Sequence, residues 1–170
     1  MQMIRVLSLA ATGILAVGFL APTAHAAEDA AALAKALSGA TVTLQQGLTA
    51  SEREGKPISG KYELEDGALQ LSVYTAKSGK FTEVIVDHTS GAIKKAEEIT
   101  DADDLKDAKE QNEAMGAAKV SLSSATGQAA TANTGYSVVR AIPTIKSGHP
   151  VADIRLMKGE TMKEVEQKLD

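Results

Sequence analysis

The chain has 170 residues, no cysteine and a formal net charge of −4 at pH 7. The lack of cysteine excludes disulfides, thiolate metal sites and cysteine nucleophiles. The acidic balance argues against nonspecific nucleic-acid binding, which depends on Lys and Arg contacts with phosphate. With no Trp, three Tyr and two Phe, a core must consist mainly of Val, Ile, Leu and Ala.

The first 26 residues have the features of a secretory signal peptide. Arg5 gives a positive start, residues 6–20 are apolar, and Ala24-His25-Ala26 matches an A-x-A cleavage signal. The apolar segment is shorter than the roughly 20 residues that a membrane span needs. We therefore expect cleavage after Ala26 and a periplasmic or secreted protein without stable membrane insertion. An uncleaved N-terminal anchor is the alternative.

Two helices are predicted next. Residues 28–37 carry apolar side chains at helical spacing, and Ser38-Gly39 ends the pattern. The second helix has Thr43 as its N-cap and runs to about Glu54, where Gly55 stops it. Small residues on its inner stripe predict close approach to a sheet; the stripe consists of Leu44, Gly47, Leu48 and Ser51.

An antiparallel meander of four strands is expected to follow, over residues 61–65, 69–75, 81–87 and 92–99. Asp66-Gly67 is a strong signal for a two-residue hairpin. Lys77-Ser78-Gly79-Lys80 and His88-Thr89-Ser90-Gly91 read as further turns. The alternation of apolar and polar residues predicts one buried and one wetter sheet face.

A connecting helix is predicted within residues 100–119, with Thr100 as N-cap and Asp103 placed for a capping box. Its charged residues indicate a solvated surface. The expected inner stripe is weak and consists of Leu105, Ala108, Asn112 and Met115.

The remaining residues, 120–170, repeat the helix-then-strands order. Ser121 is the predicted N-cap of a helix with an alanine-rich stripe: Leu122, Ala125, Ala129 and Ala132. Strands are expected over 136–145 and 151–156, and residues 160–169 close the chain. Pro143 predicts an edge position or a bulge in the first of these strands, because proline lacks the N–H that a central strand needs.

The two halves share sequence features. The shared pairs are Val42-Thr43-Leu44 with Val120-Ser121-Leu122, Lys77-Ser78-Gly79 with Lys146-Ser147-Gly148, and Glu83-Val84-Ile85-Val86 with Asp153-Ile154-Arg155-Leu156. One such unit is too small to bury a good core alone, so two units are expected to share one core.

Residues 83–93 resemble the signature end of a PepSY domain: an apolar strand, Asp87, three variable residues, Gly91 and a short apolar strand. Residues 120–170 resemble a degenerate repeat of the same family, in which Met157 falls at the Asp position. The resemblance covers most of residues 42–170.

The resemblance implies an α+β fold of two tandem PepSY-like units, each a helix packed on an antiparallel β-meander. The expected boundaries are the signal peptide at 1–26, unit 1 with its short N-terminal helix at 27–99, the connecting helix at 100–119 and unit 2 at 120–170.

For function, the resemblance implies a non-catalytic periplasmic binding or regulatory protein. PepSY domains occur in propeptides of thermolysin-type peptidases, where an inhibitory role has been proposed. The expected partner is an envelope protein, with a peptidase as the family-level expectation, and not a nucleic acid. The alternative is a periplasmic carrier of a small ligand or metal, with a concave pocket between the units or a cluster around His88 and Asp87. A structural or stress-related protein without a specific ligand is a third hypothesis.

The residues themselves give no catalytic, cofactor-binding or metal-binding assignment. His88 beside Asp87 falls far short of a metal site and is interpreted as a turn residue, as is His149. Met115, Met157 and Met162 are irregularly spaced, which favours core filling over thioether ligation of a soft metal.

No G-x-S-x-G, P-loop, G-x-G-x-x-G or H-E-x-x-H motif is present, and the adjacent carboxylates Glu97-Glu98 and Asp103-Asp104 do not form an acid–base pair. An edge strand near Pro143 could accept an extended peptide by β-augmentation. The favoured interpretation is an edge that Pro143 protects.

Overall fold

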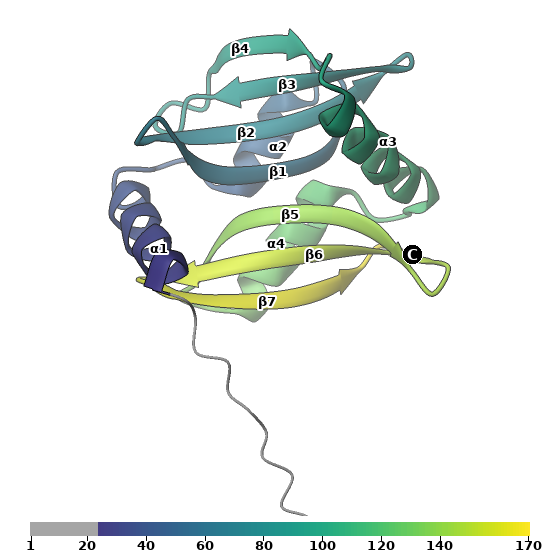
Figure 1. Cartoon of the computed structure of the whole chain (residues 1–170). Helices are drawn as coiled ribbons and strands as arrows, with labels where there is room; N and C mark the ends of the chain where they lie inside the picture. The colour runs from purple at the N-terminus through teal and green to yellow at the C-terminus, as the bar shows by residue number, and fades with distance from the viewer. Residues whose placement is uncertain (1–23) are drawn as a thin grey trace, which may run out of the picture.

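One seven-stranded antiparallel sheet and four helices make up the computed structural model, which describes residues 24–170 (Figure 1). The α+β fold class is therefore confirmed. The signal-peptide prediction for residues 1–26 lies outside the described residues, apart from the last three. Helix α1 (Ala24–Leu37) contains the helix predicted at 28–37. Within the described part of the chain, no helix has the length and apolar character that crossing a membrane requires.

The sheet brings together strands that are far apart in the sequence. Strands β1 and β5 are neighbours at its centre, and β4 and β7 are its edges. The full order is β4 (Ile93–Glu98), β3 (Lys80–Val86), β2 (Ala68–Lys77), β1 (Lys56–Glu65), β5 (Ser137–Lys146), β6 (His149–Lys158) and β7 (Thr161–Lys168).

The pairing of β1 with β5 is short. It consists of Gly60 opposite Ala141 and Lys61 opposite Arg140. By contrast, the pairing of β1 with β2 extends from Lys56 opposite Ala76 to Glu65 opposite Ala68. We call the β1–β5 pairing the seam.

Helices cover both faces of the sheet near the seam. Helices α2 (Leu44–Ser51) and α4 (Leu122–Ala132) pack against each other and against one face. Helix α3 (Ala102–Ala117) lies on the opposite face, across β5 and β1, and is in front in Figure 1. Helix α1 lies at one end of the sheet, where it contacts β2.

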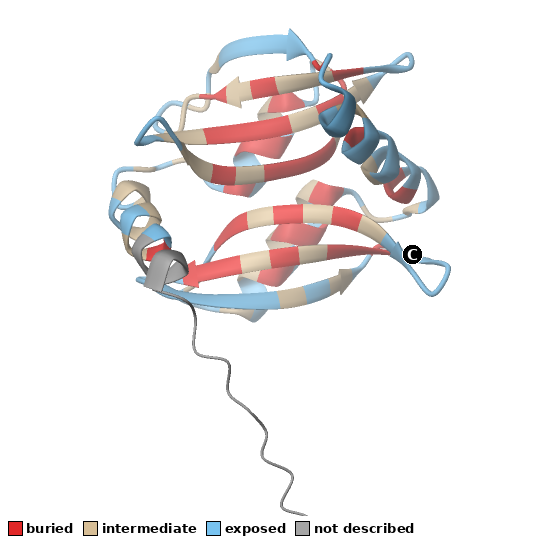
Figure 2. Ribbon diagram, in the orientation of Figure 1, coloured by how far each residue is buried: buried red, intermediate tan, exposed pale blue. Residues whose placement is uncertain are grey.

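The core lies between the sheet and the α2–α4 layer. Burial is concentrated in the inner strands, whereas β4 and β7 are largely exposed (Figure 2). The sheet residues that face α2 and α4 include the fully buried side chains of Leu71, Val73, Val84, Ile154 and Leu156. Charged side chains of the inner strands, such as Lys61, Arg140 and Arg155, alternate with these buried positions. The predicted division into a buried and a wetter face is confirmed.

Helix α2 approaches the sheet closely, as its small residues predicted. All four predicted stripe residues are buried. A Cβ added at Gly47 would lie 2.7 Å from Leu71 Cδ2, a separation that packed atoms do not tolerate. Thr43 is the N-cap, and it forms a capping box with Gln46. The helix ends at Ser51 instead of near Glu54, because the chain turns before Gly55.

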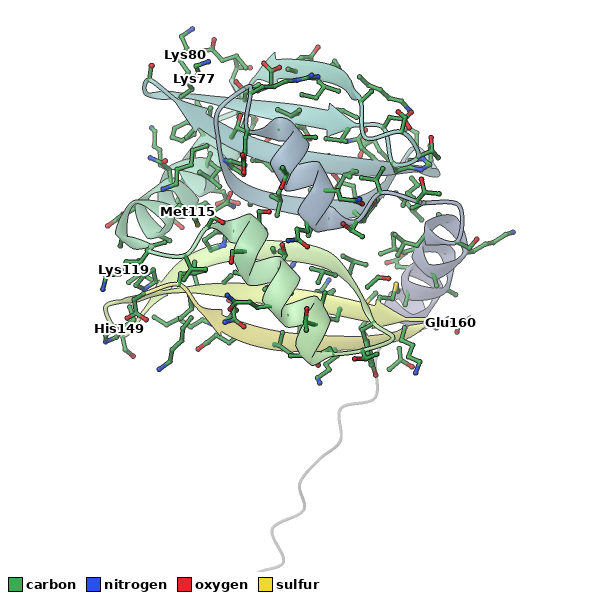
Figure 3. The ribbon with its side chains drawn as sticks, turned by 180° about the vertical axis from the view of Figure 1, so that it is seen from behind. Lys77, Lys80, Met115, Lys119, His149 and Glu160 are labelled. Atoms are coloured by element: carbon green, nitrogen blue, oxygen red, sulfur yellow. The ribbon has the colours of Figure 1, made fainter. Side chains whose placement is uncertain are left out.

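The α2–α4 pair is packed just as closely (Figure 3). The Gln45 side chain lies over Gly127, where an added Cβ would be 2.6 Å from Gln45 Nε2. The hydroxyls of Thr49 and Ser123 share a hydrogen bond of 3.0 Å. These contacts join the two halves of the chain on the α2–α4 face of the sheet.

The predicted turns are confirmed, and three of them have two successive residues with positive φ: Asp66-Gly67, Ser78-Gly79 and Ser147-Gly148. Ser78 and Gly79 have φ values of 53° and 81°, and Ser147 and Gly148 have values of 52° and 83°. Positive φ at both central positions gives the twist that tight hairpins need. The Ser78-Gly79 turn joins β2 to β3, away from the seam, whereas the Ser147-Gly148 turn joins the seam strand β5 to β6.

Three details of the helices differ from the expectation. Asp101, not Thr100, is the N-cap of α3, because its carboxylate accepts hydrogen bonds from the backbone N–H groups of Asp103 and Asp104. Asn112 is exposed, and Gln111 faces the sheet in its place. In α4, Ala132 is exposed and Thr126 is buried.

The expected edge near Pro143 is wrong. Strand β5 is central, and Pro143 is paired with Ala152 of β6. Proline is tolerated there because β1 pairs with β5 only at Arg140 and Ala141, so the missing N–H falls beyond that ladder. The first strand also starts earlier than expected, at Lys56, with a register shift between Pro57 and Ser59.

We predict that Gly47→Ala lowers the free energy of unfolding by about 1–3 kcal/mol, as overpacking does in a filled core. The new methyl group would press on the Leu71 side chain, which has no exposed surface. Chemical denaturation of the variant and the wild-type chain provides the measurement.

Gly116→Ala is the matched control, because the same substitution near the end of α3 meets no atom within 4 Å. It should raise stability by up to about 1 kcal/mol, since alanine loses less backbone entropy than glycine. Equal stabilisation by both substitutions would show that close approach does not constrain α2.

Candidate binding site

A cavity of about 210 Å³ lies between the two halves of the chain at one end of the seam. We call it the seam pocket. Its walls come from the end of α1, the loop that leads into α2, strand β1, helix α4 and the start of β5. The lining residues are Leu37, Ala40, Thr41, Val42, Thr43, Leu44, Gln45, Tyr62, Thr126, Ala130, Tyr136, Ser137 and Val138.

Hydrogen bonds fix the loop that forms one wall of the seam pocket. The backbone N–H groups of Thr41 and Val42 both donate to the His88 carbonyl oxygen, at 3.0 Å each. The Thr41 hydroxyl donates to the Thr89 carbonyl at 2.6 Å. The Tyr62 hydroxyl donates to the Val42 carbonyl. The wall is therefore held both by the β3–β4 turn and by β1.

The chemistry of the seam pocket is mainly apolar. Burial raises the pKa of Tyr62 to about 12, so its hydroxyl stays protonated and keeps donating to the loop at neutral pH. The Thr126 hydroxyl donates to the Ser123 carbonyl at 2.8 Å, within its own helix. With these hydroxyls engaged, the pocket offers chiefly aliphatic and aromatic surface.

The size of the seam pocket restricts its occupants. Sites for drug-sized ligands and cofactors usually enclose about 300–1,000 Å³. At about 210 Å³, this pocket suits one aliphatic or aromatic side chain, or a ligand of similar size.

Asp87 organises the turn after β3. Its Oδ1 accepts hydrogen bonds from the Thr89 N–H, the Thr89 hydroxyl and the Ser90 N–H, at 2.9, 2.6 and 2.7 Å. Its Oδ2 lies 2.8 Å from Lys94 Nζ. The ion pair with Lys94 and these hydrogen bonds hold the pKa of Asp87 well below its usual range. Both carboxylate oxygens are thus engaged in the turn.

The backbone carbonyl of His88 accepts the hydrogen bonds from the N–H groups of Thr41 and Val42. Its Nδ1 atom is buried and has no hydrogen-bond partner among the described residues. His149 lies in a different hairpin, where its Nδ1 is 2.7 Å from Asp170 Oδ2, and this contact lowers the pKa of Asp170. No group of three or more His, Cys, Asp or Glu residues in the described range could hold a metal ion.

Of the three methionines for which core filling was predicted, two fill the core. Met115 and Met157 are buried, whereas Met162, opposite Met157 in β7, is 39% exposed. Ser78 and Ser147 lie in the tight turns already described, which confirms their interpretation as turn residues.

Sequence reasoning did not find the seam pocket residues. Tyr62, Tyr136 and Thr126 belong to three segments whose contact depends on the pairing of β1 with β5. The sequence analysis expected a concave pocket between the halves but assigned no residues to it.

We predict that Asp87→Asn lowers stability at pH 7, because the amide has no charge to pair with Lys94 and accepts hydrogen bonds more weakly. A carboxylate whose folded pKa is depressed stabilises the fold above its unfolded value, 3.8, and loses this effect as the pH falls toward the folded pKa. The difference between wild type and variant in urea unfolding should therefore shrink from pH 7 to pH 3.

Asp66→Asn provides the control for that measurement, because it makes the same change in a hairpin turn where Asn-Gly is equally suitable. It should be nearly neutral at both pH values. A pH-independent effect of Asp87→Asn would contradict the role of its charge.

Comparisons of the chain with protein-family models, with curated proteins and with solved structures find no match.

Proposed function

We propose that the chain is a non-catalytic periplasmic PepSY-like protein that binds and restrains an envelope peptidase, with the seam pocket as the main contact. The observation that carries this proposal is the apolar lining of a pocket sized for one side chain. Protein interfaces often depend on a few apolar anchors that fill such pockets. A protruding aliphatic or aromatic side chain of the partner is the occupant that fits.

The proposal includes two tandem units joined by α3, and the arrangement around the seam supports it. In each half, a helix precedes the strand nearest the seam: α2 precedes β1, and α4 precedes β5. Both helices are capped by a hydroxyl residue, Thr43 or Ser121. Helix α3 follows β4 and precedes α4, as a connecting helix would.

Register shifts support the same division. One lies between Pro57 and Ser59 in β1, and the other lies between Val138 and Arg140 in β5. Both come just before the residues that meet at the seam, Gly60 and Ala141.

Counted outward from the seam, β5, β6 and β7 take the places of β1, β2 and β3. The turn at Ser147-Gly148 then matches the turn at Asp66-Gly67, not the turn at Ser78-Gly79 with which the shared Lys-Ser-Gly sequence paired it. In this comparison β4 is the additional strand.

A small-ligand carrier is the second candidate function. The position of the seam pocket between the two halves favours it, because a carrier needs a concave site of that kind. The two functions differ in their occupant: a side chain of a protein or a free molecule of similar size.

We predict that Ala130→Leu abolishes capture of the partner peptidase from periplasmic extract. Ala130 lines the pocket from α4, so the larger side chain would occupy the space that the partner needs. Tagged wild-type and variant proteins are used as bait, and each eluate is analysed by mass spectrometry and metal analysis. The captured peptidase is then assayed with added wild-type protein, which should slow its turnover.

Ala132→Leu is the matched control, since Ala132 is exposed on the same helix and does not line the pocket. This variant should capture and inhibit the peptidase as the wild type does. Equal capture by both variants would reject the seam pocket as the contact. A stoichiometric small molecule or metal in the wild-type eluate, without a peptidase, would favour the carrier.

A further inference from the structure

A second cavity, of about 200 Å³, lies on the other face of the sheet between α3 and the seam. We call it the α3 cavity. Its sheet side includes Lys61 of β1 and Arg140 of β5, which are paired with each other in the seam. Its helix side includes Asp104 and Asp107. Two cations on the sheet therefore face two carboxylates on the helix.

These opposite charges do not pair across the α3 cavity. None of the ion pairs among the described residues joins α3 to the sheet. Lys61 Nζ contacts Glu63 of its own strand at 2.6 Å. The Arg140 Nε atom is buried and has no hydrogen-bond partner in the described part of the chain. An orphaned guanidinium N–H is costly, which makes it a strong donor for an incoming anion.

Direct bonds hold α3 above the sheet at this distance. The Ser59 hydroxyl donates to Gln111 Oε1 at 2.6 Å, and Lys56 Nζ donates to the Met115 carbonyl at 2.5 Å. The helix therefore has a defined height, and the space between the charges is a feature of the fold. A volume of about 200 Å³ equals the space of about seven water molecules at roughly 30 Å³ each.

We propose that the α3 cavity binds a small zwitterion of the α-amino-acid type. The carboxylate of the ligand contacts Arg140 and Lys61, and its ammonium group contacts Asp104 and Asp107. Arginine presents parallel N–H donors that match a carboxylate. A ligand with one charge is disfavoured, because one side of the cavity attracts it and the other repels it.

This inference is independent of the proposed peptidase contact. The seam pocket lies between α2, α4 and the sheet, whereas the α3 cavity lies on the opposite face. No lining residue is common to the two. Each site can therefore be tested without changing the other.

The test is to titrate the full-length protein with L-alanine. Binding is followed by calorimetry and by backbone amide shifts. We expect saturable binding with shifts at Arg140 and along α3. Acetate and methylamine, which carry one charge each, should bind at least roughly tenfold more weakly than L-alanine.

Three variants locate the site. Arg140→Gln and Asp107→Asn should each weaken L-alanine binding at least roughly tenfold. Arg53→Gln is the control, because Arg53 follows α2, pairs with Glu54 and does not line the α3 cavity. Asp107 is exposed, so Asp107→Asn keeps the test decisive even if Arg140→Gln does not fold.

Three results would overturn the proposal. In the first, L-alanine shows no saturable binding at millimolar concentrations. In the second, acetate binds as tightly as L-alanine. In the third, the Asp107→Asn variant binds L-alanine as tightly as the wild type does.

Discussion

The short pairing of β1 with β5 is the constraint on which the rest of the structure depends. Only Gly60 and Lys61 of β1 reach β5 in register, so backbone hydrogen bonds alone hold the halves weakly. Side-chain packing between α2 and α4 supplies the remaining contact: the Gln45 side chain lies over Gly127, and the Thr49 and Ser123 hydroxyls share a hydrogen bond. On the outer side of α4, the N–H groups of Lys119 and Val120 donate to the Leu169 carbonyl and fix the chain end beside the start of that helix. The sheet stays continuous because helices pack across the β1–β5 pairing, its shortest ladder.

The same constraint explains why the cavities lie where they do. Where strands pair over their full length, their side chains form regular rows, and the side chains of a packed helix fill the space between these rows. At the seam the rows stop after two residue pairs, and the helices that bridge it cannot follow both diverging strands. The space left on the α2–α4 face is closed by apolar residues, which gives the seam pocket. The space on the α3 face is closed by a charged helix, which gives a polar cavity. One geometric feature thus produces two sites of opposite chemistry.

Local features of the fold could be predicted from the sequence, whereas long-range pairing could not. The caps Thr43 and Ser121 and the hairpin at Asp66-Gly67 depend on residues a few positions apart, and they were found. Pro143 was assigned to an edge because the rule for proline reports only a missing N–H; it does not reveal where the ladder with β1 ends. No sequence pattern distinguishes Arg140 and Lys61, since each lies in a strand of ordinary alternation. Their significance arises only from being opposite each other at the seam.

The outer strands of the sheet are densely charged. Strand β4 carries Lys94, Lys95, Glu97 and Glu98, and β7 has a similar density of charge. Several of these side chains pair with the neighbouring strand, as Glu98 does with Lys80 and Glu164 does with Arg155. An extended peptide added to either edge would bring its own side chains beside these charges and disturb such pairs. Charged edges of this kind resist strand addition. The seam pocket differs from both edges, because its lining is mainly apolar and a side chain could enter it without separating an ion pair. The proposed partner contact rests on this difference.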